Sequence, residues 1–415
     1  MTKKLFTQIK NEWRSNTWLA AELLIVSVVM WYIVDYVYTT AATYFEPRGF
    51  NTEHCYLIEM GQLTAKSPDY IPYQSKEEAR SQVYEMLERL RRRPEIEAVS
   101  LSQNSYPYNG SNSTTQVQID TLMSPGWTIR SCVTPDFLRV FRYEGTRGET
   151  PEQLAEMLKQ DWCFLASDNL YRKYNQSLTS FVGRNFFLYG DTTHTYRLGA
   201  ALKTVRYADF YEGSNSYRMV AQLPEDWVNF GLEWCVRVKA DQDRDFIERL
   251  KADSESQFRV GNLFIAEIRS FAEVRHNFQQ SWVTSLQSYL VGMAFLLLNI
   301  FLGLLGTFWF RTQQRRGEIA LHKIHGATPR AVFNRLLSEG FLLLSLVTPV
   351  ALVIDYVLAC NELNSWRNGT TLEWNRLLLC AAISWVLIAL MITIGIGIPA
   401  RKAMQTEPAE ALHDE

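Results

Sequence analysis

Residues 311–330, RTQQRRGEIALHKIHGATPR, form a short basic segment between two long apolar runs. The preceding run, Trp282–Phe310, contains no charged residue, and the following run is uncharged from Gly340 to Ile354. A helix of about 20 apolar residues is long enough to cross a bilayer. The segment is therefore expected to connect two membrane helices, and its excess of basic residues predicts that it lies in the cytosol.

Two further apolar runs predict two more membrane helices. Trp18–Tyr38 is interrupted only by Glu22 and Asp35, and Leu377–Ala400 has no charge at all. The first run is too long for a cleaved signal peptide, so we interpret it as an uncleaved anchor. Basic residues precede the first run and follow the fourth, so both termini are expected in the cytosol. The segment between the first two helices then lies outside.

The composition limits the possible classes of protein. The chain has 415 residues and a formal net charge of -2, and its mean hydropathy is −0.15. Most of it therefore lies outside lipid, and the charge gives no support for nucleic-acid binding. The expected fold class is a membrane protein with four transmembrane α-helices and a large extracytoplasmic α+β domain between helices one and two.

The expected order is a cytosolic segment at 1–17, the first membrane helix at 18–40, the extracytoplasmic domain at 41–270, a stalk and second membrane helix at 271–310, a coupling segment at 311–327, the third helix at 328–360, a short outer loop at 361–376, the fourth helix at 377–399 and a cytosolic tail at 400–415.

The extracytoplasmic segment has the pattern of a folded domain. Ser75 and Glu78 form a capping-box pattern at the start of an amphipathic helix. Alternating apolar residues predict strands. These are expected at IEAVSLS, TTQVQIDT, WTIRSCVT, YRLGAALKTV and EWCVRVKA.

A second capping-box pattern, Ser270 to Glu273, starts the stalk. Apolar residues then recur every three or four positions, which predicts one helix from Phe271 to about Phe310, roughly 60 Å long. A break near Gln279–Gln280 is the alternative. A helix of that length exceeds the membrane core, so it is expected to continue above the membrane.

The basic segment itself has room for one short helix. Gly326 is expected to end it, and Thr328 and Pro329 are typical of the first residues of a new helix. One interpretation is a rigid connection that moves two membrane helices together. The alternative is a basic turn that only fixes topology.

The motifs resemble the FtsX/MacB-like family of ABC-transporter permeases. RRGEIALHKIHGAT fits the family pattern R-x-x-E-I-x-x-x-K-x-x-G-A-[ST], and PARKAMQTEPAEAL, Pro399 to Leu412, is similar to the family's ending. TPDFLRVF, LASDNLYRKY, VGRNFFLYG and YRLGAALKTV follow one another in the order of the MacB-like periplasmic core domain.

The resemblance implies a type VII permease whose short helix docks on a separate ATPase. The implied coupling residues are Arg315, Glu318, Ile319, Leu321, His322, Lys323, Ile324, Gly326, Ala327 and Thr328. The chain has no G-x-x-x-x-G-K-[ST] phosphate loop, so ATP and Mg are expected on the partner ATPase, with no cofactor and no enzyme activity in this chain.

The expected partners are the cytosolic ABC ATPase, a second permease copy or close paralogue, membrane lipid, and a possible periplasmic adaptor or outer-membrane channel. Gly292, Gly303 and Gly306 are candidates for close helix packing in the dimer. The expected location is the cell inner membrane, with the large domain in the periplasm.

Several polar residues need a separate interpretation. Glu22, Asp35 and Asp355 are acids in or near lipid, where such residues are often functional. The matching contexts VDYV and IDYV favour interfacial acids beside a tyrosine anchor. A proton relay and a specific helix-packing or partner contact remain the alternatives.

The cysteines and histidines suggest no metal site or redox motif. His322 and His325 have a spacing that can bind metal, but no third ligand lies nearby, so no metal is expected. Four cysteines of the large domain allow three disulfide pairings, which spacing cannot distinguish. They are Cys55, Cys132, Cys163 and Cys235.

Two functional classes fit the sequence. In the first, the permease exports a peptide, drug or lipid-linked substrate by moving its outer domain, a behaviour called mechanotransmission. In the second, an FtsX-like transducer uses the same motion to activate an extracytoplasmic enzyme or signal to a sensor. The sequence does not identify the substrate. It also does not distinguish a homodimer from a heterodimer with a paralogue.

Overall fold

The structure, a computed structural model, describes residues 13–189, 191–314, 317, 321, 324–326, 328–361 and 373–405. The chain divides into two compact units. The membrane unit comprises Met1–Ala42 and Thr284–Glu415, and the inserted domain comprises Thr43–Val283. The inserted domain thus extends past the boundary expected at residue 270, because it includes the first turns of the stalk.

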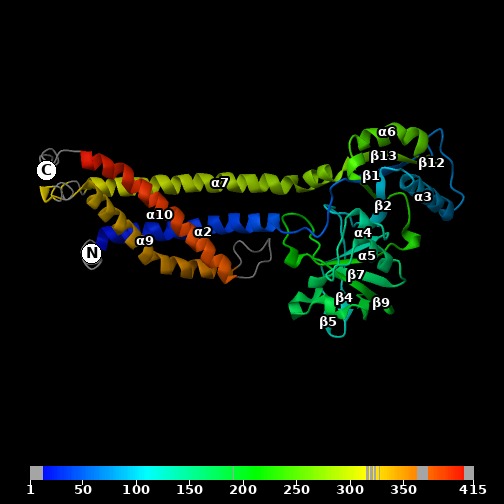
Figure 1. The fold of residues 1–415 in the computed structure, drawn as a ribbon, viewed down its shortest axis with the longest axis horizontal. Helices are drawn as coiled ribbons and strands as arrows, with labels where there is room; N and C mark the ends of the chain where they lie inside the picture. Colours follow the sequence, from blue (N-terminus) through cyan, green and yellow to red (C-terminus); the bar gives the residue numbers. More distant parts are fainter. Residues whose placement is uncertain are drawn as a thin grey trace. The chain divides into compact units, whose positions relative to one another are not determined.

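Within the described ranges, four helices are long and apolar enough to cross a membrane. They are α2 (Trp13–Phe45), α7 (Phe271–Gln314), α9 (Pro329–Cys360) and α10 (Trp374–Gln405). The predicted class, four membrane helices with a large sheet-containing domain between the first two, is confirmed (Figure 1). The expected Asn361–Arg376 loop lies mostly outside the described residues.

An apolar core holds the four helices of the membrane unit together. It is built from Leu19, Leu23, Val26 and Met30 of α2, Leu304 and Phe308 of α7, Leu343 and Leu344 of α9, and Ile388, Ala389, Ile392 and Ile396 of α10. Gly340 permits a close approach of α9 to α10, because a Cβ there would lie 2.8 Å from Cγ2 of Ile392. Close helix contacts in membranes rely on such small residues.

Asp35 makes a helix-packing contact, which is one of the alternatives that the sequence left open. Asp35 is fully buried, and its carboxylate accepts from Nε of Arg376 at 2.7 Å and from a terminal guanidinium nitrogen of Arg376 at 2.6 Å. This bidentate pair joins α2 to α10. Asp355 of α9 is only 3% exposed. Both acids therefore belong to the interior of the helix bundle, where an unpaired charge would be costly.

The inserted domain contains one mixed sheet with helices beside it. Its strands are β1 (Cys55–Gln62), β2 (Ile96–Gln103), β3 (Ser113–Thr115), β4 (Val117–Ile119), β5 (Leu122–Met123), β6 (Thr128–Val133), β7 (Cys163–Ser167), β8 (Asn185–Leu188), β9 (Asp191–Leu202), β10 (Arg218–Gln222), β11 (Glu233–Val238), β12 (Arg259–Val260) and β13 (Leu263–Ser270). Its α-helices are α3 (Lys76–Arg91), α4 (Phe137–Val140), α5 (Pro151–Leu158) and α6 (Phe246–Gln257). Its 3₁₀ helices are η1 (Asp168–Tyr174), η2 (Leu178–Phe181), η3 (Gly213–Asn215), η4 (Glu225–Trp227) and η5 (Ala240–Gln242).

The strand order is β12-β13-β1-β11-β2-β6-β10-β7-β9-β8-β4-β5, with β3 beside β6. The pairs β10–β6 and β7–β9 are parallel, and the others are antiparallel. The predicted strand TTQVQIDT is divided, because Ser113–Thr115 pairs with β6 whereas Val117–Ile119 pairs with β8.

Three apolar cores hold the helices against this sheet. The α3 residues Val83 and Met86 pack with Phe246 of α6 in the first core. The second core includes Leu154 of α5 and Phe271, the first residue of α7. The third core lies around β4, β7, β8, β9 and η1. Ser75 caps α3 as predicted, since its hydroxyl accepts from the Glu78 N–H at 3.2 Å.

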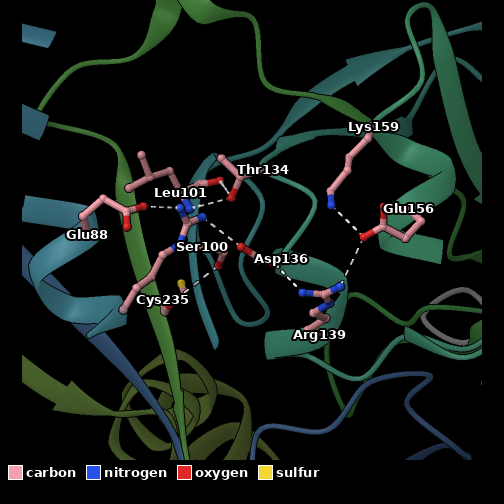
Figure 2. A network of polar contacts seen from close by, with 10 residues as sticks. Glu88, Ser100, Leu101, Thr134, Asp136, Arg139, Glu156, Lys159 and Cys235 are labelled. Atoms are coloured by element: carbon pink, nitrogen blue, oxygen red, sulfur yellow. Dashed lines mark hydrogen bonds and ion pairs between the residues drawn. The ribbon is translucent and has the colours of Figure 1, made fainter. Parts of the chain in front are cut away.

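A chain of alternating charges joins α3, α4 and α5. Arg91 pairs with Glu88 at 2.7 Å and with Asp136 at 2.8 Å. Figure 2 shows the continuation through Asp136, Arg139, Glu156 and Lys159. These side chains are largely exposed, so each pair contributes little to stability, about 0–1 kcal/mol.

The boundary of the inserted domain can be tested with two fragments. A fragment of residues 43–283 should be soluble and cooperatively folded, whereas one of residues 43–267 lacks Phe271 and Val274, which are buried in the domain core. Burial of each such side chain stabilises by about 1.5–3 kcal/mol. Thermal unfolding followed by circular dichroism should give a clearly lower Tm for the shorter fragment. Equal Tm values would contradict the longer boundary.

Candidate functional site

The predicted coupling segment lies between the end of α7 at Gln314 and the start of α9 at Pro329. Leu321, Ile324, Gly326 and Thr328 belong to the part of the chain that the structure describes. The remaining predicted coupling residues lie outside the described residues, and they are Arg315, Glu318, Ile319, His322, Lys323 and Ala327.

The turn into α9 has a defined geometry. His325 donates its backbone N–H to the carbonyl of Leu321 at 3.2 Å, and Gly326 has a φ of 85°, in the left-handed region that favours glycine. The Thr328 hydroxyl accepts from the Ala331 N–H at 3.3 Å, and Pro329 occupies the first turn of α9. The turn residues predicted from sequence are thus those that change the chain direction here.

Two apolar side chains of the segment are open to contact. Leu321 is 52% exposed and Ile324 is 57% exposed. They lie three residues apart, and both positions are helical, so they share one side of a helical turn. A small apolar surface of this kind is suited to docking in a groove of another protein.

The helices that flank the segment pack against each other. Phe308 of α7 shares the membrane core with Leu343 and Leu344 of α9. Near the start of α9, Arg335 pairs with the largely buried Glu339, four residues later, at 3.8 Å. A displacement of the segment must therefore act on α7 and α9 together.

The helix α7 continues without interruption from Gln314 to Phe271. The prediction of one helix through Gln279–Gln280 is confirmed, and the helix ends four residues beyond Phe310. Its first residues belong to the inserted domain, where Phe271 is fully buried and Val274 is 6% exposed. At about 1.5 Å per residue, the 44 residues span roughly 66 Å.

The inserted domain holds both of its membrane connections at one loop, which we call the junction loop (residues 205–211). Arg206 in this loop is fully buried. Its guanidinium donates to the carbonyl oxygens of Thr43 and Glu46 at 2.6 Å each, and to those of Asp209 at 2.6 Å and Tyr211 at 2.9 Å. Thr43 belongs to the last turn of α2. Arg206 therefore fastens the end of α2 to the domain.

Asp209 of the same loop holds the start of α7. Its fully buried carboxylate contacts Nε of Arg275 at 2.7 Å, Nε of Arg48 at 3.1 Å and the Tyr108 hydroxyl at 2.9 Å. Burial raises the pKa of Asp209, but hydrogen bonds and the positive charges of Arg48 and Arg275 outweigh burial and bring its pKa below the ordinary value. The carboxylate is thus ionised when it binds α7 through Arg275.

Aromatic side chains extend this contact along the stalk. The Tyr207 ring lies 5.6 Å from the Phe278 ring, measured between centroids, and Trp282 lies 4.9 Å from Tyr211 and 6.1 Å from Phe210. Together with Arg275, these pairs place three successive turns of α7 against the junction loop. Edge-to-face and offset aromatic contacts favour specific orientations.

No local sequence pattern marks the junction loop. The stretch Val205–Tyr211 carries an arginine and an aspartate among aromatic residues, and neither residue type at that spacing marks a buried contact. Arg376 falls at the end of the outer loop expected at 361–376, whereas it belongs to α10 and pairs with Asp35 in the membrane unit. Only the folded chain brings these residues together, since Arg206 lies 163 positions from Thr43 and Arg376 lies 341 positions from Asp35.

The glycines predicted for dimer packing lie on an uncovered part of α7. A Cβ at Gly292 or Gly306 would meet no atom within 4 Å in the described part of the chain, whereas at Gly303 it would lie 3.8 Å from Oε1 of Glu22. Glu22 accepts from the Thr307 hydroxyl at 3.0 Å, so it also contributes a helix-packing contact between α2 and α7. The dimer contact at these glycines stays a prediction.

The cysteines show no sign of reactivity. Cys55, Cys132, Cys163 and Cys235 are buried and unpaired. Burial raises the pKa of the Cys55 thiol to about 12 and raises that of Cys235 well above its ordinary value. Within the described ranges, no three His, Cys, Asp or Glu side chains gather as metal ligands would.

One known protein family matches the C-terminal part of the chain. Residues 290–408 match the family described as FtsX-like permease C-terminal. The match includes most of the membrane-spanning part of α7, the coupling segment, α9 and α10. No curated protein matches the chain.

The contribution of Asp209 can be tested by substitution and by pH. Asp209→Asn removes the charge that faces Arg48 and Arg275, which should cost about 3 kcal/mol of domain stability at pH 7. Because the folded pKa of Asp209 is lowered, its contribution is present above the unfolded pKa of about 3.9 and is lost as pH falls through the folded pKa. The difference between wild type and variant should therefore shrink below about pH 4.

Chemical unfolding of the fragment of residues 43–283 at several pH values provides the measurement. Asp120→Asn is the control, since Asp120 forms an exposed pair with Arg184 at 2.9 Å and should change stability by less than about 1 kcal/mol. A loss at pH 7 no larger for Asp209→Asn than for Asp120→Asn would refute the role of this residue.

Proposed function

Since residues 290–408 belong to the FtsX-like permeases, we propose that the chain is the permease subunit of an ABC transporter that transmits ATP-driven motion to its inserted domain. In this proposal a separate cytosolic ATPase binds ATP and Mg, and the chain itself is not an enzyme. The coupling segment, Arg315 to Thr328, docks on that ATPase. The inserted domain, with its MacB-like order of motifs, is the part that moves.

The uninterrupted α7 is the observation that supports this proposal most directly. One end of the helix leads into the coupling segment, and the other end is buried in the core of the inserted domain. An α-helix resists bending unless Pro, Gly pairs or bulges interrupt it. A movement at Gln314 is thus transmitted along the helix rather than absorbed by a loop.

The charge distribution supports the orientation. Arg311, Arg315, Arg316, Arg330 and Arg335 lie in or beside the coupling segment, and by the positive-inside rule this favours a cytosolic position for this end of α7. Both termini then lie in the cytosol. The four helices then cross the inner membrane, and the inserted domain lies in the periplasm.

Export is the activity that we favour for this motion. The two cavities described in the membrane unit have volumes of about 20 Å³ each, which is too small for a peptide or a lipid. Such a unit fits a permease that works by moving its outer domain, with an adaptor or outer-membrane channel receiving a peptide, drug or lipid-linked substrate. An FtsX-like transducer that activates an enzyme or sensor uses the same motion, and the identity of the co-purifying chains distinguishes the two.

A second copy of the chain, or a close paralogue, completes the proposed complex. Gly292, Asn299 and Gly306 recur every seven residues on α7, so they lie on one side of the helix. Asn299 is exposed, and its side-chain N–H donates to its own helix at the Phe295 carbonyl, 2.7 Å away. An exposed amide between two glycines in a membrane helix is suited to contact with another helix.

The docking prediction concerns Leu321. Leu321→Asp would place an unpaired charge in the contact with the ATPase, which should weaken binding by several kcal/mol, about 3 or more. Leu321→Met keeps an apolar side chain of similar size and is the matched control. Affinity purification in mild detergent, with identification of every bound chain, should recover the ATPase with wild type and with Leu321→Met only. Equal recovery with Leu321→Asp would contradict docking at this residue.

The transmission prediction concerns the exposed residue Gln280 on the stalk. Gln280→Pro should break α7 within the turns that pack against the junction loop, at a local cost of about 3 kcal/mol, while Gln280→Ala leaves the helix intact. The proline variant should still bind the ATPase and support ATP hydrolysis, but transport or activation through the inserted domain should be lost. An ATPase assay and a transport or activation assay in lipid measure both properties. Full output with a broken stalk would exclude transmission through α7.

The dimer prediction concerns Gly292 and Gly306, which lie on one side of α7. Gly292→Leu or Gly306→Leu should separate two closely packed helices, and the mass of the solubilised complex should fall toward that of one permease. The control is Val291→Leu, because Val291 is 70% exposed and already carries a branched side chain. Mass photometry gives the readout, and an unchanged dimer mass in both glycine variants would place the contact elsewhere.

A further inference from the structure

A small cavity lies within the membrane unit among α2, α9 and α10. Its walls include Ser27 and Trp31 of α2, Thr348 and Asp355 of α9, and Ser384 of α10, with apolar side chains between them. Figure 1 shows these three helices close together in the membrane unit. The family match and the coupling mechanism assign no role to this cavity.

Three polar atoms at the cavity have no hydrogen-bond partner in the described part of the chain. They are Oγ of Ser27, Nε1 of Trp31 and Oδ1 of Asp355. The three residues are 8%, 2% and 3% exposed, so bulk water does not reach them freely. Buried polar atoms almost always have a partner, since leaving one unsatisfied costs about 1–3 kcal/mol, and more for a charged group.

Among the described residues, no nearby positive charge is available to Asp355. Arg376 is engaged in the bidentate pair with Asp35, and the Asp35 carboxylate is close enough to Asp355 to interact with it electrostatically. Asp35 carries the same sign as Asp355, so it offers no compensation. The cavity must supply the missing hydrogen bonds in another way.

We propose that the cavity is a binding site for ordered water, which bridges Asp355, Ser27 and Trp31. Its volume is about 20 Å³, and about 10–15 Å³ suffices for one water molecule. Water accepts a hydrogen bond from the Trp31 N–H, donates one to Oδ1 of Asp355, and can do either with the Ser27 hydroxyl. A single ligand thus satisfies all three atoms.

The chemistry of the walls favours water over a metal cation. The Trp31 N–H is a donor only, and its hydrogen would face a cation unfavourably. The hydroxyls of Thr348 and Ser384 donate to their own helices, to the carbonyls of Leu344 and Cys380 at 2.7 Å each. Water-mediated hydrogen bonds are nearly as favourable as direct ones, so the site joins α2 to α9 inside the membrane.

Hydroxyl-radical footprinting of the full chain in lipid nanodiscs tests the site, because radiolysis of a bound water labels the side chains beside it. Trp31 should be labelled several-fold faster than its burial predicts. Met30 is the internal control, since it is 1% exposed, lies next to Trp31 and packs in the apolar core instead. Rates are compared after correction for the intrinsic reactivities of Trp and Met.

Substitutions then remove the water without removing the probe. Ser27→Val should fill part of the cavity and lower Trp31 labelling toward the corrected Met30 rate, whereas Ser27→Ala should preserve the space and much of the labelling. Asp355→Asn should retain the water, because an amide oxygen still accepts. If Ser27→Val does not fold, the wild-type comparison and Ser27→Ala still decide the question.

Three results would overturn the proposal. Trp31 labelling in wild type no faster than the corrected Met30 rate would show a dry cavity. Unchanged labelling in a folded Ser27→Val protein would place the reactive water elsewhere. A rise in Tm in sodium or potassium chloride relative to equal N-methylglucamine chloride, lost in Asp355→Asn, would show that a cation occupies the site instead.

Discussion

The structure depends on one continuous ladder of backbone hydrogen bonds, that of α7. In lipid every peptide group must find its partner within the chain, and an uninterrupted helix is the simplest way to do so. Here the same ladder continues beyond the apolar stretch into the inserted domain, where Phe271 and Val274 are buried. The requirement set by the membrane and the requirement for a stiff connection are met by the same 44 residues.

The junction loop holds the ends of α2 and α7 within the inserted domain. Arg206 and Asp209 are both fully buried, and each must keep nearly all of its hydrogen bonds, because a buried charge that loses a partner is costly. The planar guanidinium of Arg206 reaches four carbonyl oxygens at once, which a lysine could not do with the same geometry. The ends of α2 and α7 within the inserted domain are therefore held in a fixed relation to each other.

Much of this architecture could be predicted from the sequence because it follows from local patterns. Charge-free runs identify membrane helices, and Gly326, Thr328 and Pro329 mark a helix end and a helix start within four residues. The strands β2, β6 and β11 follow from alternating apolar residues. The break between β3 and β4 does not, since it arises from pairing with two different neighbours, β6 and β8.

The buried polar contacts could not be predicted for a related reason. Asp35 and Asp355 have the same local context, yet Asp35 meets Arg376 and Asp355 meets a cavity. The difference between them arises from the packing of α10, which supplies Arg376 to Asp35. The sequence around either aspartate does not reveal that packing. The four cysteines illustrate the same limit, because their burial as free thiols depends on the long-range packing of the sheet.

The pair between Asp35 and Arg376 also bears on how the chain is made. Asp35 belongs to α2 and Arg376 to α10, 341 positions later in the chain, so α2 leaves the ribosome well before its partner. Until α10 has been synthesised, α2 carries a carboxylate into the bilayer without its guanidinium partner, at a cost of about 2.5–3.5 kcal/mol on insertion scales. A chain truncated before α10 would therefore keep the Asp35 carboxylate in α2 without Arg376. The ion pair thus makes the stability of α2 in the membrane depend on the presence of α10.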